Sequence, residues 1–297
     1  MRKSIIGLFF CLISSALWAA ESDSSVVFKA SFLKNELHSY EISRTLYTLQ
    51  KGDTTSFERI RIKADMYVKD STENYYLVTW KFSDFSINTN SSQLKQLVAS
   101  AKPVEICCRI SKPGVFIEFL DGEHVSSCLD DAMPKILEQY AGKKGKEVEV
   151  EVASIYDMRE TIETLMLRSV SQFYQVYGLG YNLGEIVDVP TEVISRFSPT
   201  PILGMTRKKL TKIDPINHLA ILSSATFLDD KGLQKAITEY LHIDSLPDNA
   251  IHQENMGGVV MDLSTGWLLW TFDQREIKTG NTIYGERVEI EHLNGSL

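Results

Sequence analysis

Histidines and adjacent acidic residues are the side chains whose spacing most directly tests for metal or acid–base chemistry. The six histidines are scattered, and none belongs to an H-x-H or H-E-x-x-H motif or to a C-x-x-C partner set. The acidic pairs Asp130-Asp131 and Asp229-Asp230 stand at expected helix ends, where carboxylates complement the helix dipole. We interpret them as capping residues, and we predict no catalytic residue, metal site or cofactor.

Three glycines, Gly178, Gly180 and Gly184, resemble a dinucleotide-binding loop at first sight. Such a loop follows a strand and opens a helix, because the helix N-terminus holds the phosphates. Here a helical pattern precedes the glycines, a strand pattern follows them, and the third glycine comes one position late. We therefore interpret this stretch as the end of a helix. The chain also has no Walker loop and no G-x-S-x-G motif.

Large aromatic side chains on strand-like segments are the candidates for ligand contacts. A strongly curved sheet covered by amphipathic helices often leaves an apolar cleft. The side chains expected to line it are Trp80, Phe82, Trp267, Trp270 and Phe272. The alternative is that the same residues form an ordinary core.

Three cysteines, Cys107, Cys108 and Cys128, remain when Cys11 in the N-terminal segment is set aside. Alternation over residues 104–110 places Cys108 on the core face of a strand and Cys107 on the polar face. Either of them could form a disulfide with Cys128, closing a loop of about 20 residues and stabilising the fold by roughly 3 kcal/mol. The spacing is not that of a C-x-x-C redox motif.

The N-terminus has the pattern of an export signal. Arg2 and Lys3 precede an apolar run over residues 5–18, and small residues follow at positions 19 and 20. The run is too short for a bilayer span, which needs about 20 residues. We expect residues 1–20 to be a cleaved signal peptide and the mature protein to be periplasmic or extracellular, with no integral membrane span. The net charge of −8 argues against a nucleic-acid partner.

Alternating and helical patterns divide the rest of the chain into expected elements. Alternation predicts two antiparallel hairpins, one over residues 59–82 and one over residues 104–120. Helical spacing then predicts a helix over 125–140, interrupted at Pro134, and another that is capped by Asp157. Between these helices, valines alternating with glutamates over residues 147–152 suggest a further strand.

The second half repeats this style, with one helix expected at 230–241. Its strand-like segments lie near 185–197, 202–213, 216–226, 257–263, 267–277 and 283–293. Grouped strands with few helices between them predict an α+β fold: a curved, mostly antiparallel, half-barrel-like sheet with a few amphipathic helices on one face. Residues 21–297 are expected to form one large domain, with two similar halves at about 27–180 and 181–297 as a variant of that organisation.

A distinctive turn follows the alternating segment that ends at Asp262. Asp262 and Ser264 are expected to hold the turn amides, Gly266 to take a positive φ, and the flanking tryptophans to pack. Together with the leader and the 57–85 hairpin, this turn resembles exported Gram-negative bacterial proteins grouped under domains of unknown function. In architecture the chain also looks like the periplasmic lipoprotein carriers, which implies a curved sheet with helices on its concave face.

Three functions are consistent with these patterns. The first is a non-enzymatic periplasmic or secreted binding or carrier module for an apolar or amphipathic ligand. The second is a cell-envelope module that binds another protein. The third is a hydrolase whose carboxylates assemble from distant strands, which would place strongly shifted pKa values in a cleft. We favour the first function, and hence a protein that is not an enzyme.

Overall fold

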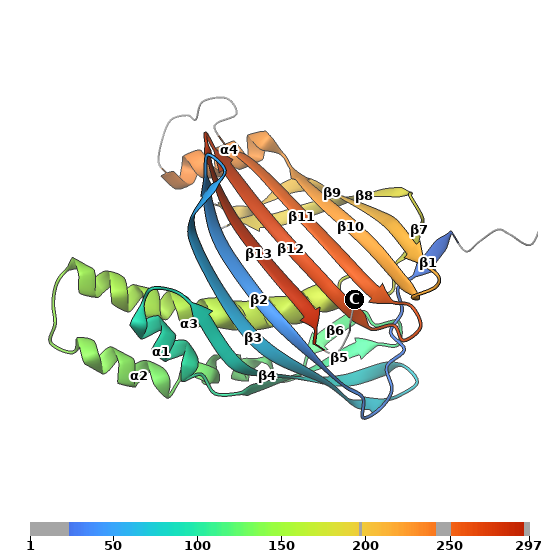
Figure 1. The fold of residues 1–297 in the computed structure, drawn as a ribbon, viewed down its shortest axis with the longest axis horizontal. Helices are drawn as coiled ribbons and strands as arrows, with labels where there is room; N and C mark the ends of the chain where they lie inside the picture. The colour runs from blue at the N-terminus through green and yellow to red at the C-terminus, as the bar shows by residue number, and fades with distance from the viewer. Residues whose placement is uncertain (1–23, 196–197, 242–250, 294–297) are drawn as a thin grey trace, which may run out of the picture.

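The computed structural model describes residues 24–195, 198–241 and 251–293. Most of these residues belong to one eleven-stranded antiparallel sheet, and helices lie against one of its faces (Figure 1). A separate antiparallel pair is formed by β1 (Ser25–Val27) and β7 (Gly180–Asn182). The predicted signal peptide, residues 1–20, lies outside the described residues.

The strands of the large sheet, in the order in which they lie side by side, are β6 (Phe116–Phe119), β5 (Val104–Ser111), β4 (Tyr75–Asn88), β3 (Asp53–Ser71), β2 (Leu37–Gln50), β13 (Thr282–His292), β12 (Leu268–Thr279), β11 (His252–Asp262), β10 (Leu219–Leu228), β9 (Ser198–Asp214) and β8 (Ile186–Ser195). The helices are α1 (Ser92–Ala99), η1 (Gly122–Leu129), α2 (Ala132–Leu137), η2 (Glu138–Tyr140), α3 (Lys146–Tyr174) and α4 (Asp230–Leu241).

The predicted α+β class with a half-barrel-like sheet is wrong. Strands account for 53% of the structure and helices for 24%, and four α-helices occur among the described residues. The sheet is open, since its terminal strands β6 and β8 lie at opposite ends of the strand order. The prediction underestimated the strands because it missed β2 altogether and gave β3 about half of its length.

Both predicted hairpins are confirmed. In β3 the apolar residues Ile60, Ile62, Ala64, Met66 and Val68 are all buried, and the residues between them face the other side. This is the two-residue period of a strand with one wet face. The next strand, β4, pairs with β3 along the whole predicted segment, and β5 pairs with β6.

The two halves of the chain meet in the middle of the sheet. The last strand, β13, pairs with β2 from His292 opposite Tyr40 to Thr282 opposite Gln50. Strands from residues 27–180 and from residues 181–297 therefore hydrogen-bond within one sheet. Periodicity within either strand could not predict this pairing, because it joins segments more than 200 residues apart.

The strand suggested at residues 147–152 is instead the first part of α3. Val148 and Val152, four residues apart, pack against the hydrophobic core, whereas Val150 is exposed. That distribution follows the helical period, because positions i and i+4 share a face and position i+2 does not. Glu147 and Glu149 lie in the first turn, where negative charge complements the helix dipole. Asp157, the expected cap, consequently lies inside the helix.

Two further sequence predictions concern helix ends. The helix predicted over 125–140 is divided, as expected, into η1, α2 and η2, with Pro134 in the first turn of α2. Asp229 caps α4, because its carboxylate accepts a hydrogen bond from the backbone amide of Gly232 at 2.9 Å. Asp131 precedes α2 but makes no capping hydrogen bond, so its predicted role as a cap is wrong.

The turn between β11 and β12 has the predicted chemistry. The backbone amide and hydroxyl of Ser264 both donate to Asp262 Oδ1, at 2.8 and 2.6 Å. Gly266 has φ = 72° and lies against the backbone of Lys29 and Ser31, so a side chain there would clash. The glycine-rich stretch after α3 is also confirmed as a helix end, because α3 precedes it and β7 follows.

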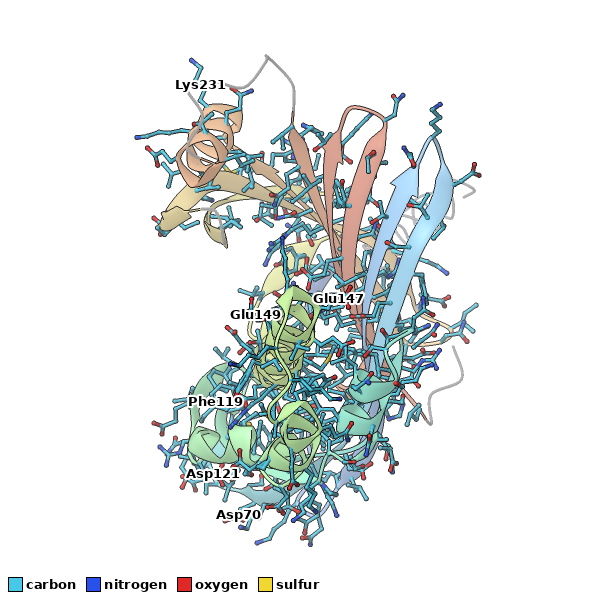
Figure 2. All side chains as sticks on the ribbon, turned by 90° about the vertical axis from the view of Figure 1, so that its left-hand side faces the viewer. Asp70, Phe119, Asp121, Glu147, Glu149 and Lys231 are labelled. Carbon is cyan, nitrogen blue, oxygen red and sulfur yellow. The ribbon has the colours of Figure 1, made fainter. Side chains whose placement is uncertain are left out.

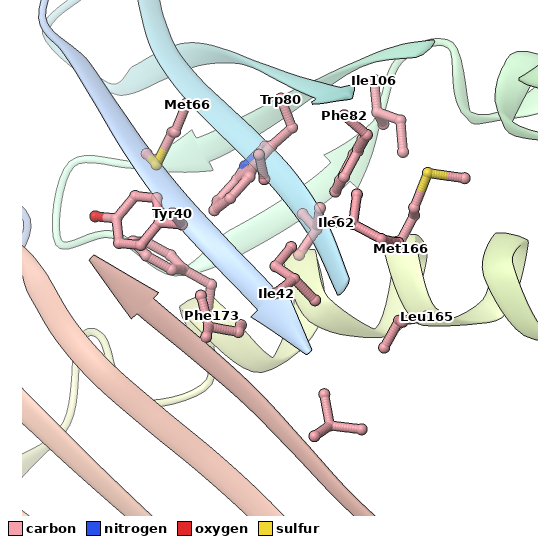
Figure 3. Packing of buried hydrophobic residues seen from close by; sticks show 14 of the residues in the cluster. Tyr40, Ile42, Ile62, Met66, Trp80, Phe82, Ile106, Leu165, Met166 and Phe173 are labelled. Atoms are coloured by element: carbon pink, nitrogen blue, oxygen red, sulfur yellow. The ribbon is translucent and has the colours of Figure 1, made fainter. Parts of the chain in front are cut away.

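The main core lies between the inner face of β2–β5 and the second half of α3 (Figure 3). Leu165, Met166 and Phe173 from α3 pack on residues such as Ile42 and Phe82 from the sheet. A small second cluster joins α4 to β9 through Ile202, Leu233, Ala236 and Ile237. The core therefore closes the half of the sheet's inner face that β2–β5 form.

Candidate functional site

Two of the five aromatic candidates are core residues. Trp80 is fully buried, and its Nε1–H donates to the hydroxyl of Tyr174 at 3.1 Å. Its ring also meets Phe173 of α3 edge to face, at 5.1 Å between centroids. Phe82, also fully buried, stacks beside it (Figure 3). Because α3 seals this part of the sheet, Trp80 and Phe82 line no cavity among the described residues.

Trp267 is buried at a different place. Its ring stacks between Phe32 and His38, with centroids 4.0 and 3.8 Å away. Its Nε1–H donates to Glu36 Oε1 at 2.9 Å. Trp267 thus packs the segment over residues 32–38 against the β11–β12 turn.

The last two candidates, Trp270 and Phe272, lie on the outer face of β12. They alternate with Thr271, which is fully buried, and with Asp273, which pairs with α3 on the inner face. The guanidinium of Arg287 lies 4.5 Å from the centre of the Phe272 ring. The structure therefore does not bring the five predicted ligand contacts together, although Phe272 also borders the cavity described next.

The inner face of β8–β12 carries a cavity with a volume of about 800 Å³. The second half of α3 forms one wall through Thr164, Arg168 and Gln175. A cavity of about 560 Å³ shares Thr164 and Arg168 with it, and one of about 280 Å³ shares Val193 and Arg275. We call these three connected cavities the concave groove. In Figure 2, Glu147 and Glu149 mark the start of α3 and Lys231 marks α4, on either side of this opening.

The groove exists because neighbouring rows of side chains across the inner face differ in polarity and size. We call each row of residues that pair across adjacent strands a rung. One rung is buried and, apart from Thr271, apolar: Leu210, Leu222, Val259, Thr271, Ile290, Ile42 and Ile62. Two residues further along each strand, the neighbouring rung reads Lys208, Ser224, Gly257, Asp273, Val288 and Arg44. Small residues at Ser224 and Gly257 give the cavity its depth, and charged residues flank them. Each strand is therefore part core and part groove.

Ion pairs connect α3 to the floor of the groove. Arg168 of α3 pairs with Asp273 of β12 at 2.5 Å and approaches Glu286 of β13 at 3.8 Å. Arg44 of β2 donates to Glu286 at 2.7 Å. Burial acts to raise the pKa of Glu286, but Arg44, Arg168 and Arg275 outweigh it and lower the pKa. Glu286 is thereby kept ionised, a state in which it is not a general acid.

A second polar cluster lies at the opposite end of β2. His38 Nδ1 and His292 Nε2 are 2.8 Å apart, and His38 Nε2 lies 3.1 Å from Glu36 Oε1. Burial lowers the pKa of His292, and the neighbouring His38 lowers it further. The sequence gives no sign of this contact, because 254 residues separate the two histidines in the chain.

The cysteines have the predicted placement on β5. Cys108 is buried in the core and Cys107 is partly exposed. Burial raises the pKa of the Cys108 thiol to about 12 and that of the Cys128 thiol to about 11. All three cysteines are free thiols, so the candidate disulfide is not formed in this structure.

Among the described residues, no three His, Cys, Asp or Glu side chains gather as metal ligands would. In the same part of the chain, no helix combines the length and the apolar character that a bilayer crossing requires. The groove residues themselves were missed by sequence reasoning. A usable signal was nevertheless present, because residues an even number of positions apart on a strand share a face. Lys208 therefore lies on the same face of β9 as buried Leu210, and Arg275 on the same face of β12 as buried Thr271.

Comparison with known proteins places the chain in no family, since no family model and no curated protein matches it. Among solved structures, one of lipovitellin concerned with lipid–protein interactions is 8% identical, with a TM-score of 0.43. The match covers 88% of this chain but only 25% of that chain. A candidate exported protein of Bacteroides fragilis with a YmcC-like fold is 8% identical, with a TM-score of 0.18, over 90% of this chain and 100% of its own. Both scores are too low to carry an argument about fold or function.

Proposed function

We propose that this protein is a non-enzymatic binding or carrier module that holds an apolar or amphipathic ligand in the concave groove. The observation that carries the proposal is the cavity of about 800 Å³ beside α3. Its size lies within the roughly 300–1,000 Å³ of typical ligand sites. The predicted signal peptide supports a location for this function in the periplasm or outside the cell.

The lining of the groove supports an amphipathic ligand. Apolar side chains from three elements border the main cavity: Val176 after α3, Val189 and Val193 on β8, and Leu222 on β10. Hydroxyl and amide side chains alternate with them, including Thr191, Thr206, Thr226 and Asn255. Apolar surface supplies binding free energy by leaving water, and the polar groups orient the ligand.

A fluorescent probe tests this function. N-phenyl-1-naphthylamine, which is neutral and gains fluorescence in apolar sites, is titrated into the wild-type protein and two variants. Ser224→Phe places a ring on the cavity floor, whereas Ser223→Phe places the same ring on the outer face of the same strand. We expect saturable binding that weakens at least about tenfold in Ser224→Phe, because the ring occupies the cavity. Binding should be retained in Ser223→Phe.

Two results would contradict the proposal. One is the absence of saturable binding to the wild-type protein. The other is equal binding by the Ser224→Phe and Ser223→Phe variants, which would place the probe elsewhere on the surface. Urea unfolding of both variants shows that any loss of binding is not a loss of folding.

A further inference from the structure

Two cations in the concave groove lack a direct ion pair among the described residues. Lys208 of β9 and Arg275 of β12 both border the main cavity. No ion pair within 4.0 Å joins either of them to a described carboxylate, and Arg275 Nε is buried without a hydrogen-bond partner. Lys208 is only partly exposed, and burial lowers its pKa.

The other arginines of the groove differ in this respect. Arg44 pairs with Glu286, and Arg168 pairs with Asp273 and approaches Glu286. The carboxylates of Glu286 and Asp273 are therefore already in ion pairs with Arg44 and Arg168. The remaining acid at the main cavity, Glu192, is exposed and makes no ion pair among the described residues. Lys208 is held partly away from water without an ion pair, and Arg275 shares the charge of Glu286 with Arg44 and Arg168, so an anion entering the cavity would be favourable beside both cations.

Hydrogen-bond donors lie beside the two cations. The hydroxyls of Thr191 and Thr206, and those of Thr206 and Thr226, are 2.8 Å apart and form a chain across β8, β9 and β10. Thr206, Thr226, Asn255 and Arg275 lie on one rung of the sheet, next to the rung that holds Lys208. Three steps between strands, about 4.8 Å each, separate Lys208 from Arg275. Both side chains border the same cavity, one from each side of β10 and β11.

We infer that the ligand of the concave groove is an amphipathic anion, whose carboxylate or phosphate head group lies between Lys208 and Arg275 and whose apolar part lies along Val176, Val189, Val193 and Leu222. This inference rests on the proposed function and narrows its ligand class. The cations supply charge-assisted hydrogen bonds, and the valines and leucine supply apolar contact.

The test compares ligands that share one alkyl chain. Laurate, dodecyl phosphate and neutral dodecanol each displace N-phenyl-1-naphthylamine from the wild-type protein, and inorganic phosphate is included as a head group without a chain. We expect both anionic amphiphiles to bind at least about tenfold more tightly than dodecanol, since the cations form charge-assisted hydrogen bonds only with a charged head group. Inorganic phosphate should not displace the probe. The ratio between laurate and dodecyl phosphate identifies the preferred head group.

Charge variants locate the head group. Lys208→Met and Arg275→Met should each lower the affinity for the anions about tenfold and leave the affinity for dodecanol within about twofold. Lys208→Arg and Arg275→Lys should retain the preference for anions. Lys209→Met and Lys278→Met are matched controls, because they remove exposed cations from the same two strands and should change neither affinity.

The outcomes separate the two proposals. If no amphiphile displaces the probe, the proposed function fails. If dodecanol and the anions bind equally well, the groove binds ligands but the inference about the head group is wrong. If the preference for anions survives in either methionine variant, that cation does not contact the head group and the two-cation site is refuted. If inorganic phosphate displaces the probe, the ligand does not need an apolar part.

Discussion

Arg168 of α3 and Asp273 of β12 form an ion pair at 2.5 Å, although 105 residues separate them in the chain. The pair lies at the boundary between the two largest cavities of the concave groove, since Arg168 borders both of them. It fixes α3 against the sheet at the point where the apolar core ends.

The Arg168–Asp273 pair should contribute modestly to stability. The side chains of Arg168 and Asp273 are 33% and 42% exposed, so solvent screens their attraction, and we expect Asp273→Asn to cost about 0.5–1 kcal/mol. A double-mutant cycle with Arg168→Met, measured by urea unfolding, isolates the coupling between the two residues. The Arg207–Asp188 pair, which joins β9 to the edge strand β8, is a comparison pair with a more exposed arginine and two hydrogen bonds. A coupling of zero for Arg168–Asp273 would show that the pair does not hold α3 in place.

Trp80 and Trp270 should respond very differently to truncation. Trp80→Ala opens a cavity in the core and removes the partner of the Tyr174 hydroxyl, so we expect a loss of about 3–5 kcal/mol. Trp270 is partly exposed on the outer face, and Trp270→Ala should cost less than about 2 kcal/mol. Urea unfolding measures both values. A stable Trp80→Ala variant that no longer binds the probe would instead assign Trp80 to the ligand site.

Gly266 should be among the least replaceable residues of the β11–β12 turn. A Cβ atom there would lie 2.3 Å from the carbonyl oxygen of Lys29 and would also require a positive φ. We expect Gly266→Ala to cost about 2–5 kcal/mol, from backbone strain and overpacking together. Gly280 also has a positive φ but open space around it, so Gly280→Ala should cost only the strain, about 1–2 kcal/mol. Equal losses in the two variants would mean that the contact with Lys29 is unimportant.

His292 should make stability depend on pH. Its folded-state pKa is lowered, first by burial and then by His38, so the unfolded chain binds a proton at a pH where the folded chain does not. The free energy of unfolding should therefore fall as the pH drops below about 6.5, by at most about 1.4 kcal/mol per unit, until the lowered pKa is reached.

The His292→Gln variant provides the control for this pH dependence. Unfolding free energies at pH 7.5 and pH 5.5 should differ less in this variant than in the wild-type protein. The groups that face His292 are His38, Tyr40 and, beyond His38, Glu36. If the variant retains the full difference, the titration belongs to one of those neighbours or to another site.

Local patterns in the sequence predicted most of the strands and the chemistry of several turns. The alternation in β3 and β4 and the turn at Asp262 and Gly266 all depend on backbone geometry within a few residues. Pattern-based prediction failed over residues 147–152, because six residues are too few to distinguish the two-residue period of a strand from the 3.6-residue period of a helix. There the helix continues to Tyr174, and packing of Val148 and Val152 on the core decides in its favour.

Tertiary structure decided which strand residues are core and which line the groove. Leu210 and Lys208 stand on the same face of β9, two residues apart, yet one is fully buried and the other borders a cavity. The difference arises from the segments that lie over each residue, since Leu183 and Gly184 contact the backbone of Leu210, and from the pairing of β13 with β2, which joins both halves of the sheet. Periodicity is visible in the sequence because it follows from the pleat of each strand. The position of a helix over a sheet is not, because it depends on contacts between segments that the chain brings together only when it folds.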